Sequence, residues 1–200
     1  MSISRYDLVI VDLDDDEIKI CLENAQFLCS TINDRPDLHL RSYMERYIDI
    51  LMGEAAEYAV IKWLKSNGKY AVSAVDKKSG KPDLGHDIIV KKLNGDEITC
   101  SVKSSLSALK NTFDDILDTF TIATKMSEVR KINVQVYYWL NLRGTAHRTT
   151  VPSTDNMAIV GWVGENDITS YSTYNGEIRQ VADMKLRNMR SMQSLLDYLQ

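Results

Sequence analysis

The sequence predicts an α/β domain with a mixed central sheet flanked by helices. Three observations predict it: two long helical segments near the start, a run of strand-like segments that includes one hairpin, and a short helical segment at the end. Helical and strand patterns alternate along one chain of 200 residues, with no repeat and no obvious linker. A single domain over 1–200 is therefore expected, with its sheet covered by the helices.

The N-terminal helical region is expected at about 17–66. Apolar residues recur at helical spacing over 17–32, and the acidic residues 14–17 suit a helix start, where the helix dipole favours negative charge. The segment 33–37 (NDRPD) interrupts the pattern, and a second helix is expected from about Leu38 to Ser66, closed by Asn67-Gly68. The pair Asp12-x-Asp14 is similar to the entry motif of haloacid-dehalogenase phosphatases, but an acidic helix start explains it more simply.

The rest of the chain carries the strands. Strands are expected at 70–75, 87–93, 97–104, 132–140 and 157–163, and helices at 113–126 and 191–199. The segments 87–93 and 97–104 flank Asn94-Gly95, a strong hairpin signal. These two strands are expected to form one hairpin over about 87–104.

The hairpin's register follows from its apolar residues. Ile88 and Val90 on the first strand must share a buried face with Ile98 and Cys100 on the second. In an antiparallel pair the residue numbers of two opposite residues have a constant sum, and the shared face requires this sum to be even. A two-residue turn would give an odd sum, so we expect a three-residue loop or a bulge at Gly95.

The same register places polar residues on the opposite face. Asp87, at the start of the first strand, is then expected beside Ser101 and Lys103 of the second. An acid, a hydroxyl and a lysine would gather on one side of the hairpin.

This pattern resembles the PD-(D/E)XK nuclease superfamily. The segment 81–90 reads KPDLGHDIIV and the segment 100–105 reads CSVKSS, so the chain has a Pro-Asp pair, a Gly-x-Asp-apolar strand start, and Ser-x-Lys-Ser where the family has (D/E)-x-K-Ser. The preceding helix offers Gly53-x-x-x-Glu57, and Gly68 follows that helix. The resemblance covers about residues 45–105 and implies a restriction endonuclease-like core.

The resemblance implies a set of site residues. Its catalytic residues would be Asp87, Lys103, Ser101 and Glu57. Its metal ligands would be Asp87, Glu57 and the backbone carbonyl of Val102, with Glu54 or Asp83 as alternates, and its cofactor would be Mg²⁺, with Mn²⁺ as a possible substitute. Bound metal polarises a phosphate and lowers the pKa of a bound water, and a lysine stabilises the charge that develops on the phosphate oxygens.

Ser101 is the departure from the family pattern, because a hydroxyl is a poorer ligand than a carboxylate for a hard cation. Simpler interpretations also exist for the single residues: Asp87 could merely end a strand, and Lys103 could be a solvated edge residue. Glu57 lies among apolar residues of its helix, where a carboxylate must be paired or metal-bound. Its partner could be a lysine, such as Lys103.

Positive charge is expected to contact DNA in three places. The net charge is −4, from 24 Lys+Arg and 28 Asp+Glu, which argues against indiscriminate coating of nucleic acid but not against local basic patches. The candidate DNA-contacting residues are Lys77, Lys78, Lys81, Arg143, Arg148, Arg179, Lys185 and Arg187. An ordinary amphipathic surface is the alternative for each of them.

These features lead to the hypothesis of a Mg²⁺-dependent endonuclease that cuts double-stranded DNA, similar to type II restriction enzymes and acting as a homodimer. The alternatives are a repair or recombination endonuclease resembling Holliday-junction resolvases, and an inactive nuclease-like module that binds DNA or a protein. Three cysteines without a CxxC pair and the lack of a long apolar stretch or a signal sequence predict a cytoplasmic protein of a prokaryote or phage, with no membrane partner.

Overall fold

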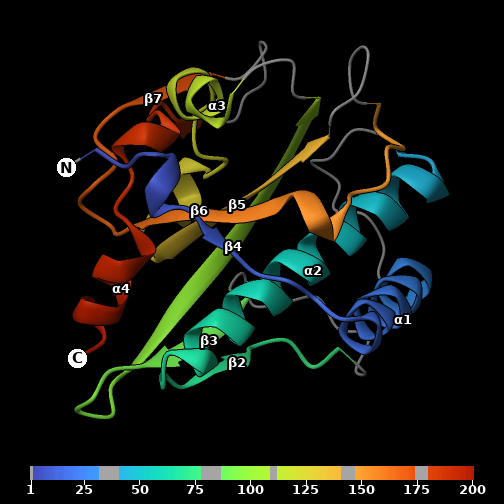
Figure 1. The fold of residues 1–200 in the computed structure, drawn as a ribbon, viewed down its shortest axis with the longest axis horizontal. Coiled ribbons are helices and arrows are strands. Elements are labelled where there is room, and N and C mark those ends of the chain that lie inside the picture. The colour runs from blue at the N-terminus through green and yellow to red at the C-terminus, as the bar shows by residue number, and fades with distance from the viewer. Residues whose placement is uncertain (1, 32–40, 78–86, 109–111, 141–146, 174–179) are drawn as a thin grey trace.

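A six-stranded mixed sheet forms the centre of the computed structural model, which describes residues 2–31, 41–77, 87–108, 112–140, 147–173 and 180–200. The strand order is β1-β6-β5-β4-β3-β2, and helices pack on the sheet (Figure 1). The predicted α/β class with a mixed sheet is therefore confirmed. The long strand β4 pairs in parallel with β5 and antiparallel with β3.

The helices and strands have the following bounds. The six strands of the main sheet are β1 (Val9–Ile10), β2 (Ala71–Ser73), β3 (Ile88–Lys91), β4 (Glu97–Ala108), β5 (Ile132–Leu140) and β6 (Met157–Val163). A separate two-stranded sheet consists of β7 (Tyr171–Thr173) and β8 (Gln180–Ala182). The α-helices are α1 (Asp15–Thr31), α2 (Tyr43–Ser66), α3 (Phe113–Thr119) and α4 (Met192–Tyr198).

Local chemistry sets the ends of the two long helices. Asp14 and Glu17 each accept the other's backbone N–H at 2.9 Å, which satisfies free donors at the start of α1. Ser42 and Glu45 form the corresponding capping box of α2, so this helix begins at Tyr43 rather than at about Leu38. It ends before Gly68, whose φ of 71° suits glycine.

The predicted helix over 113–126 is shorter in the structure and ends at Thr119. The residues that follow pair with the C-terminal part of the chain instead. The backbone N–H of Ile122 donates to Met184 O, and that of Leu186 donates to Phe120 O, both at 3.0 Å. These long-range hydrogen bonds replace the bonds that would continue the helix. The local sequence pattern does not indicate them, because their partners lie far away in the chain.

The hairpin register is confirmed. Ile88 lies opposite Cys100 and Val90 lies opposite Ile98, as the even-sum rule requires. The N–H of Lys92 donates to Asp96 O at 2.9 Å, which leaves a three-residue loop over 93–95. Gly95 has a φ of 91°, a value that glycine adopts without the steric cost of a Cβ.

The sheet is covered on both faces by separate apolar clusters. Residues of α1, α2 and α4 pack with β3–β6 in one cluster, and residues of α3, Tyr137 and the segment 182–189 pack in the other. Helices α1 and α2 lie side by side on the first face (Figure 1). The face that carries α2 is the one on which the candidate site is built.

Among the described residues, no helix is both long enough and apolar enough to cross a membrane.

Candidate functional site

A cavity of about 200 Å³ brings together acidic side chains from α2 and from the hairpin. Glu54, Glu57, Lys77, Asp87 and Val102 are among the residues that line it. Asp87 and Glu57 are 30 positions apart in the chain, and both were predicted site residues. The structure therefore places two of the predicted metal ligands at one cavity, together with Glu54, a predicted alternate.

Helix α2 presents both glutamates toward the sheet. Positions three apart lie on the same side of a helix, so Glu54 and Glu57 point in similar directions. Small buried neighbours such as Ala55 and Ala56 let the helix approach the sheet closely, and the two glutamates are only 8% and 7% exposed. Asn24 of α1 donates to Glu54 Oε2 at 3.0 Å, which fixes one of the two carboxylates.

Lys77 forms ion pairs with both glutamates. Its Nζ lies 2.5 Å from Glu54 Oε1 and 2.7 Å from Glu57 Oε2, and its side chain is largely buried. The ammonium group of Lys77, a predicted DNA contact, is the counter-ion of the two α2 glutamates. The lysine partner suggested for Glu57 exists, but it is Lys77 rather than Lys103.

Burial and ion pairing shift the pKa values of Glu57 and Lys77. Burial raises the pKa of Glu57, and the attraction of Lys77 offsets this only in part. Burial alone would lower the pKa of Lys77, but the charges of Glu57 and Glu54 outweigh it and the pKa is raised. Both groups therefore hold their protons more tightly in the folded protein than in a free side chain.

Asp87 is held by the backbone of β4. Its Oδ2 accepts the N–H of Val102 at 2.6 Å, and its own N–H donates to Cys100 O at 3.0 Å. The N–H and C=O of a strand residue point to the same edge. The Val102 carbonyl, a predicted backbone ligand, therefore faces the side on which Asp87 lies.

Ser101 and Lys103 point away from this cavity. Neighbouring strand residues alternate between faces, and Val102 lines the cavity on the α2 side. Ser101 is 1% exposed, and Lys103 Nζ lies 2.8 Å from Glu128 Oε2, in the short 3-10 turn Met126–Glu128. The predicted grouping of Asp87 with Ser101 and Lys103 on one face is therefore corrected. Asp87 lies just before the first residue of β3, and its backbone N–H donates to Cys100 O. The direction of its carboxylate is therefore not set by the alternation of side chains along a regular strand.

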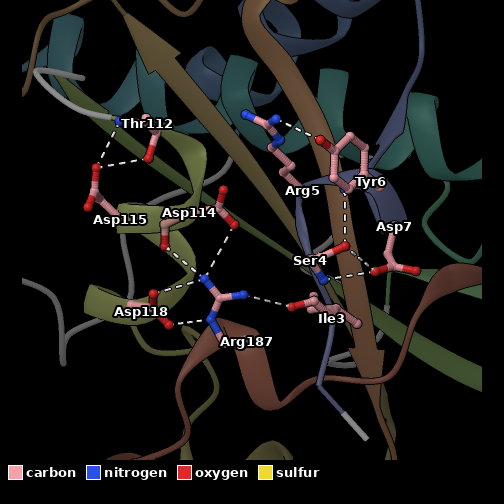
Figure 2. Close-up of polar contacts among 10 residues, drawn as sticks. All are labelled: Ile3, Ser4, Arg5, Tyr6, Asp7, Thr112, Asp114, Asp115, Asp118 and Arg187. Atoms are coloured by element: carbon pink, nitrogen blue, oxygen red, sulfur yellow. Dashed lines mark hydrogen bonds and ion pairs between the residues drawn. The ribbon is translucent and has the colours of Figure 1, made fainter.

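The basic residues Arg187 and Lys185 near the C-terminus make contacts within the chain. Arg187 forms ion pairs with Asp114 and Asp118 of α3, and its Nη1 donates to Ile3 O at 3.2 Å (Figure 2). Lys185 Nζ donates to Thr119 O at 2.7 Å. Both side chains therefore have partners within the chain, and their predicted contact with DNA stays a prediction.

Arg148 is a predicted DNA contact with a largely accessible side chain. Its side chain is 67% exposed, and its Nη1 lies 3.7 Å from Glu45 Oε1. The other predicted positions, Lys78, Lys81, Asp83, Arg143 and Arg179, lie outside the described residues.

The donor set suits a metal that needs few protein ligands. No group of three or more carboxylate, imidazole or thiol side chains that could hold a metal ion occurs within the described ranges. Mg²⁺ commonly retains several waters and takes only one or two carboxylates plus substrate phosphate oxygens. Asp87 and Glu57 could supply those carboxylates. A metal ion at Glu57 would share this carboxylate with the ammonium group of Lys77 or replace that group.

The cysteines do not add a nucleophile. Cys100 is buried, and burial raises the pKa of its thiol, so the reactive thiolate is disfavoured.

No protein-family model, no curated protein and no solved structure matches this chain.

Proposed function

We propose that this protein is a metal-dependent endonuclease that hydrolyses phosphodiester bonds in double-stranded DNA. A sequence-specific restriction enzyme, acting as a homodimer in the cytoplasm, is the finer form of this proposal. One observation carries it: Asp87 and Glu57, from two distant segments, line the same small cavity beside Lys77. The resemblance to PD-(D/E)XK nucleases had selected these two acids from their sequence setting alone.

The cavity supplies what phosphodiester hydrolysis needs from the protein. A bound Mg²⁺ would supply polarisation of the phosphate and a lowered pKa for a bound water. Asp87 and Glu57 would hold the ion, and Asp87 is already oriented by the Val102 N–H. Glu54 keeps its bond to Asn24 and would position Lys77.

Lys77 takes the role that the sequence assigned to Lys103. A positive charge beside the scissile phosphate stabilises the negative charge of the transition state. Lys77 lines the cavity with the two acids, whereas Lys103 forms its ion pair with Glu128. The amine of the proposed site therefore comes from the segment after β2 and not from β4.

The test is cleavage of plasmid DNA by purified protein with Mg²⁺ or Mn²⁺. We expect Asp87→Asn and Glu57→Gln to lower the cleavage rate at least about 100-fold, because each removes a charged metal ligand. Discrete fragments would indicate a restriction enzyme, and cutting confined to branched DNA would indicate a junction resolvase.

Matched controls separate the site from general effects of charge. Glu23→Gln on the exposed side of α1 and Asp197→Asn on α4 make the same chemical changes away from the cavity. They should cut at the wild-type rate. Equal losses in the controls, or no cleavage of any DNA with either metal, would refute the proposal.

A second candidate is an inactive nuclease-like module that binds DNA or a protein. Two observations favour it: the ammonium group of Lys77 already forms ion pairs with both α2 glutamates, and the buried Ser101 stands where the family has an acid. Tight DNA binding without cleavage by any metal would support this module.

A further inference from the structure

A second and larger cavity, of about 610 Å³, lies beside the first along α2 and β4. Met52 lines the larger cavity, and the adjacent Gly53 lines the smaller one. On β4, Ser104 lines the larger cavity two residues beyond Val102 of the smaller one, a separation of roughly 7 Å. The two cavities are therefore neighbours along α2 and β4, and the volume of the larger one is within the range of ligand sites.

An aromatic ring is fixed at the wall of this cavity. Phe120 lines it and is 40% exposed, and its ring centroid lies 5.5 Å from that of Tyr137 at a tilt of 55°. Its backbone is held on both sides, since its N–H donates to Ile116 O and its carbonyl accepts from Leu186 N at 3.0 Å. An accessible ring on a fixed backbone is a platform on which a flat aromatic group can stack.

The charged residues of the wall favour an anion. Lys125 and Arg148 line the cavity, and the Arg148 side chain is mostly exposed. Asp49 is the one carboxylate among the described lining residues, and its Oδ2 is ion-paired with Arg41 at 2.7 Å. A ligand that joins a flat aromatic group to a negative charge matches both features.

We propose that this cavity binds one unpaired nucleotide of a DNA strand, with its base stacked on Phe120 and its phosphate near Arg148. This inference rests on the proposed nuclease function, because it places the phosphodiester next to that nucleotide at Asp87 and Glu57. It specifies the substrate class as DNA with an unpaired nucleotide, because a base inside an intact duplex is already stacked and cannot occupy the cavity.

The experiment measures binding without cleavage. A fluorescein-labelled 12-residue single-stranded DNA is titrated in EDTA by fluorescence anisotropy. We expect Phe120→Ala to weaken binding about 5- to 100-fold, the effect of losing one base–aromatic contact, and Phe120→Tyr to retain it. Arg148→Ala should weaken binding and reduce the slope of log K against log salt by about 0.7.

Surface variants elsewhere are the controls. Tyr6→Ala removes an aromatic ring that is more exposed than Phe120, and Arg130→Ala removes an exposed arginine before β5. Neither should change affinity beyond its general effect on charge. Arg148→Ala changes an exposed side chain, so it tests the cavity even if Phe120→Ala proves unstable in thermal unfolding.

The outcomes distinguish this inference from the nuclease proposal. Wild-type affinity in both Phe120→Ala and Arg148→Ala, or equal losses for a blunt duplex of the same sequence, would overturn the nucleotide site even if the protein cuts plasmid DNA. Loss of single-strand binding in these variants would support the site even if no metal allows cleavage.

Discussion

One ammonium group holds two buried glutamates of α2 in place, and this contact dominates the candidate site at the residue scale. Glu54 and Glu57 are almost fully buried, and Lys77 Nζ lies within 2.7 Å of both. A buried carboxylate without a partner is strongly destabilising, far more so than an exposed one. Lys77 is therefore required for the fold as well as for the proposed chemistry.

Replacing Lys77 should be costly for stability. We expect Lys77→Met to lower the free energy of unfolding by about 3–5 kcal/mol, because two buried carboxylates lose their counter-ion. Lys62→Met is the matched control: its Nζ pairs with Glu17 at 2.6 Å, but the lysine is more exposed. It should cost at most about 1 kcal/mol. Urea denaturation measures both, and equal effects would contradict this account of the cluster.

Glu57 should also give the protein a pH dependence. Its pKa is raised in the folded state above the ordinary 4.5, so the folded protein binds this proton more tightly than the unfolded chain. Its contribution to stability is fully present below pH 4.5 and is lost as pH rises through the raised value. The stability of the wild type relative to Glu57→Gln, from urea titrations at several pH values, should therefore fall with rising pH from 4.5. A constant or rising difference would argue against the raised pKa.

At the scale of elements, the hairpin is the part of the site that local sequence specifies most fully. The apolar residues at alternate positions set which strand faces meet, and the loop must then have three residues. Gly95 accommodates that loop with a φ of 91°. The hairpin thereby carries Asp87 to the edge of β4.

Two glycines should respond in opposite ways to the same substitution. Gly95→Ala should lower the free energy of unfolding by about 1–2 kcal/mol, because a Cβ disfavours positive φ. Gly53→Ala in α2 should raise it by about 0.5–1 kcal/mol, since a Cβ there meets nothing within 4 Å and alanine is the better helix former. Chemical denaturation of the two variants measures this difference, and a gain in stability at Gly95 would exclude the strained loop.

Helix α3 illustrates the limit of local patterns at the same scale. Its sequence continues with residues that can extend a helix, yet it ends at Thr119 because the chain beyond it pairs with the segment 182–186. The partner strand lies about 60 positions away in the sequence. No periodicity in the local sequence indicates such a pairing. The pairing places Phe120 at the larger cavity.

At the scale of the whole molecule, basic residues that looked like a DNA-binding patch join distant parts of the chain. Arg187 connects the C-terminal segment to α3 and to the N-terminal residue Ile3 (Figure 2). Lys77 connects the segment after β2 to α2 in the same way. The sequence marked these residues as cationic, but only the folded structure shows that their partners are acids or carbonyl groups of the same chain.

The sequence by itself determined the fold class, the main helices and strands and the hairpin register, because these depend on periodicity and turn chemistry among residues close in the chain. The candidate acids came from the resemblance of short sequence motifs to a nuclease family. Tertiary structure alone decided that Lys77 rather than Lys103 accompanies Asp87 and Glu57, and that Ser101 points away from them. The reason is physical: Asp87 precedes the regular ladder, so strand alternation does not direct its carboxylate. A buried glutamate pairs with whichever cation the packing of α2 against the sheet brings within reach.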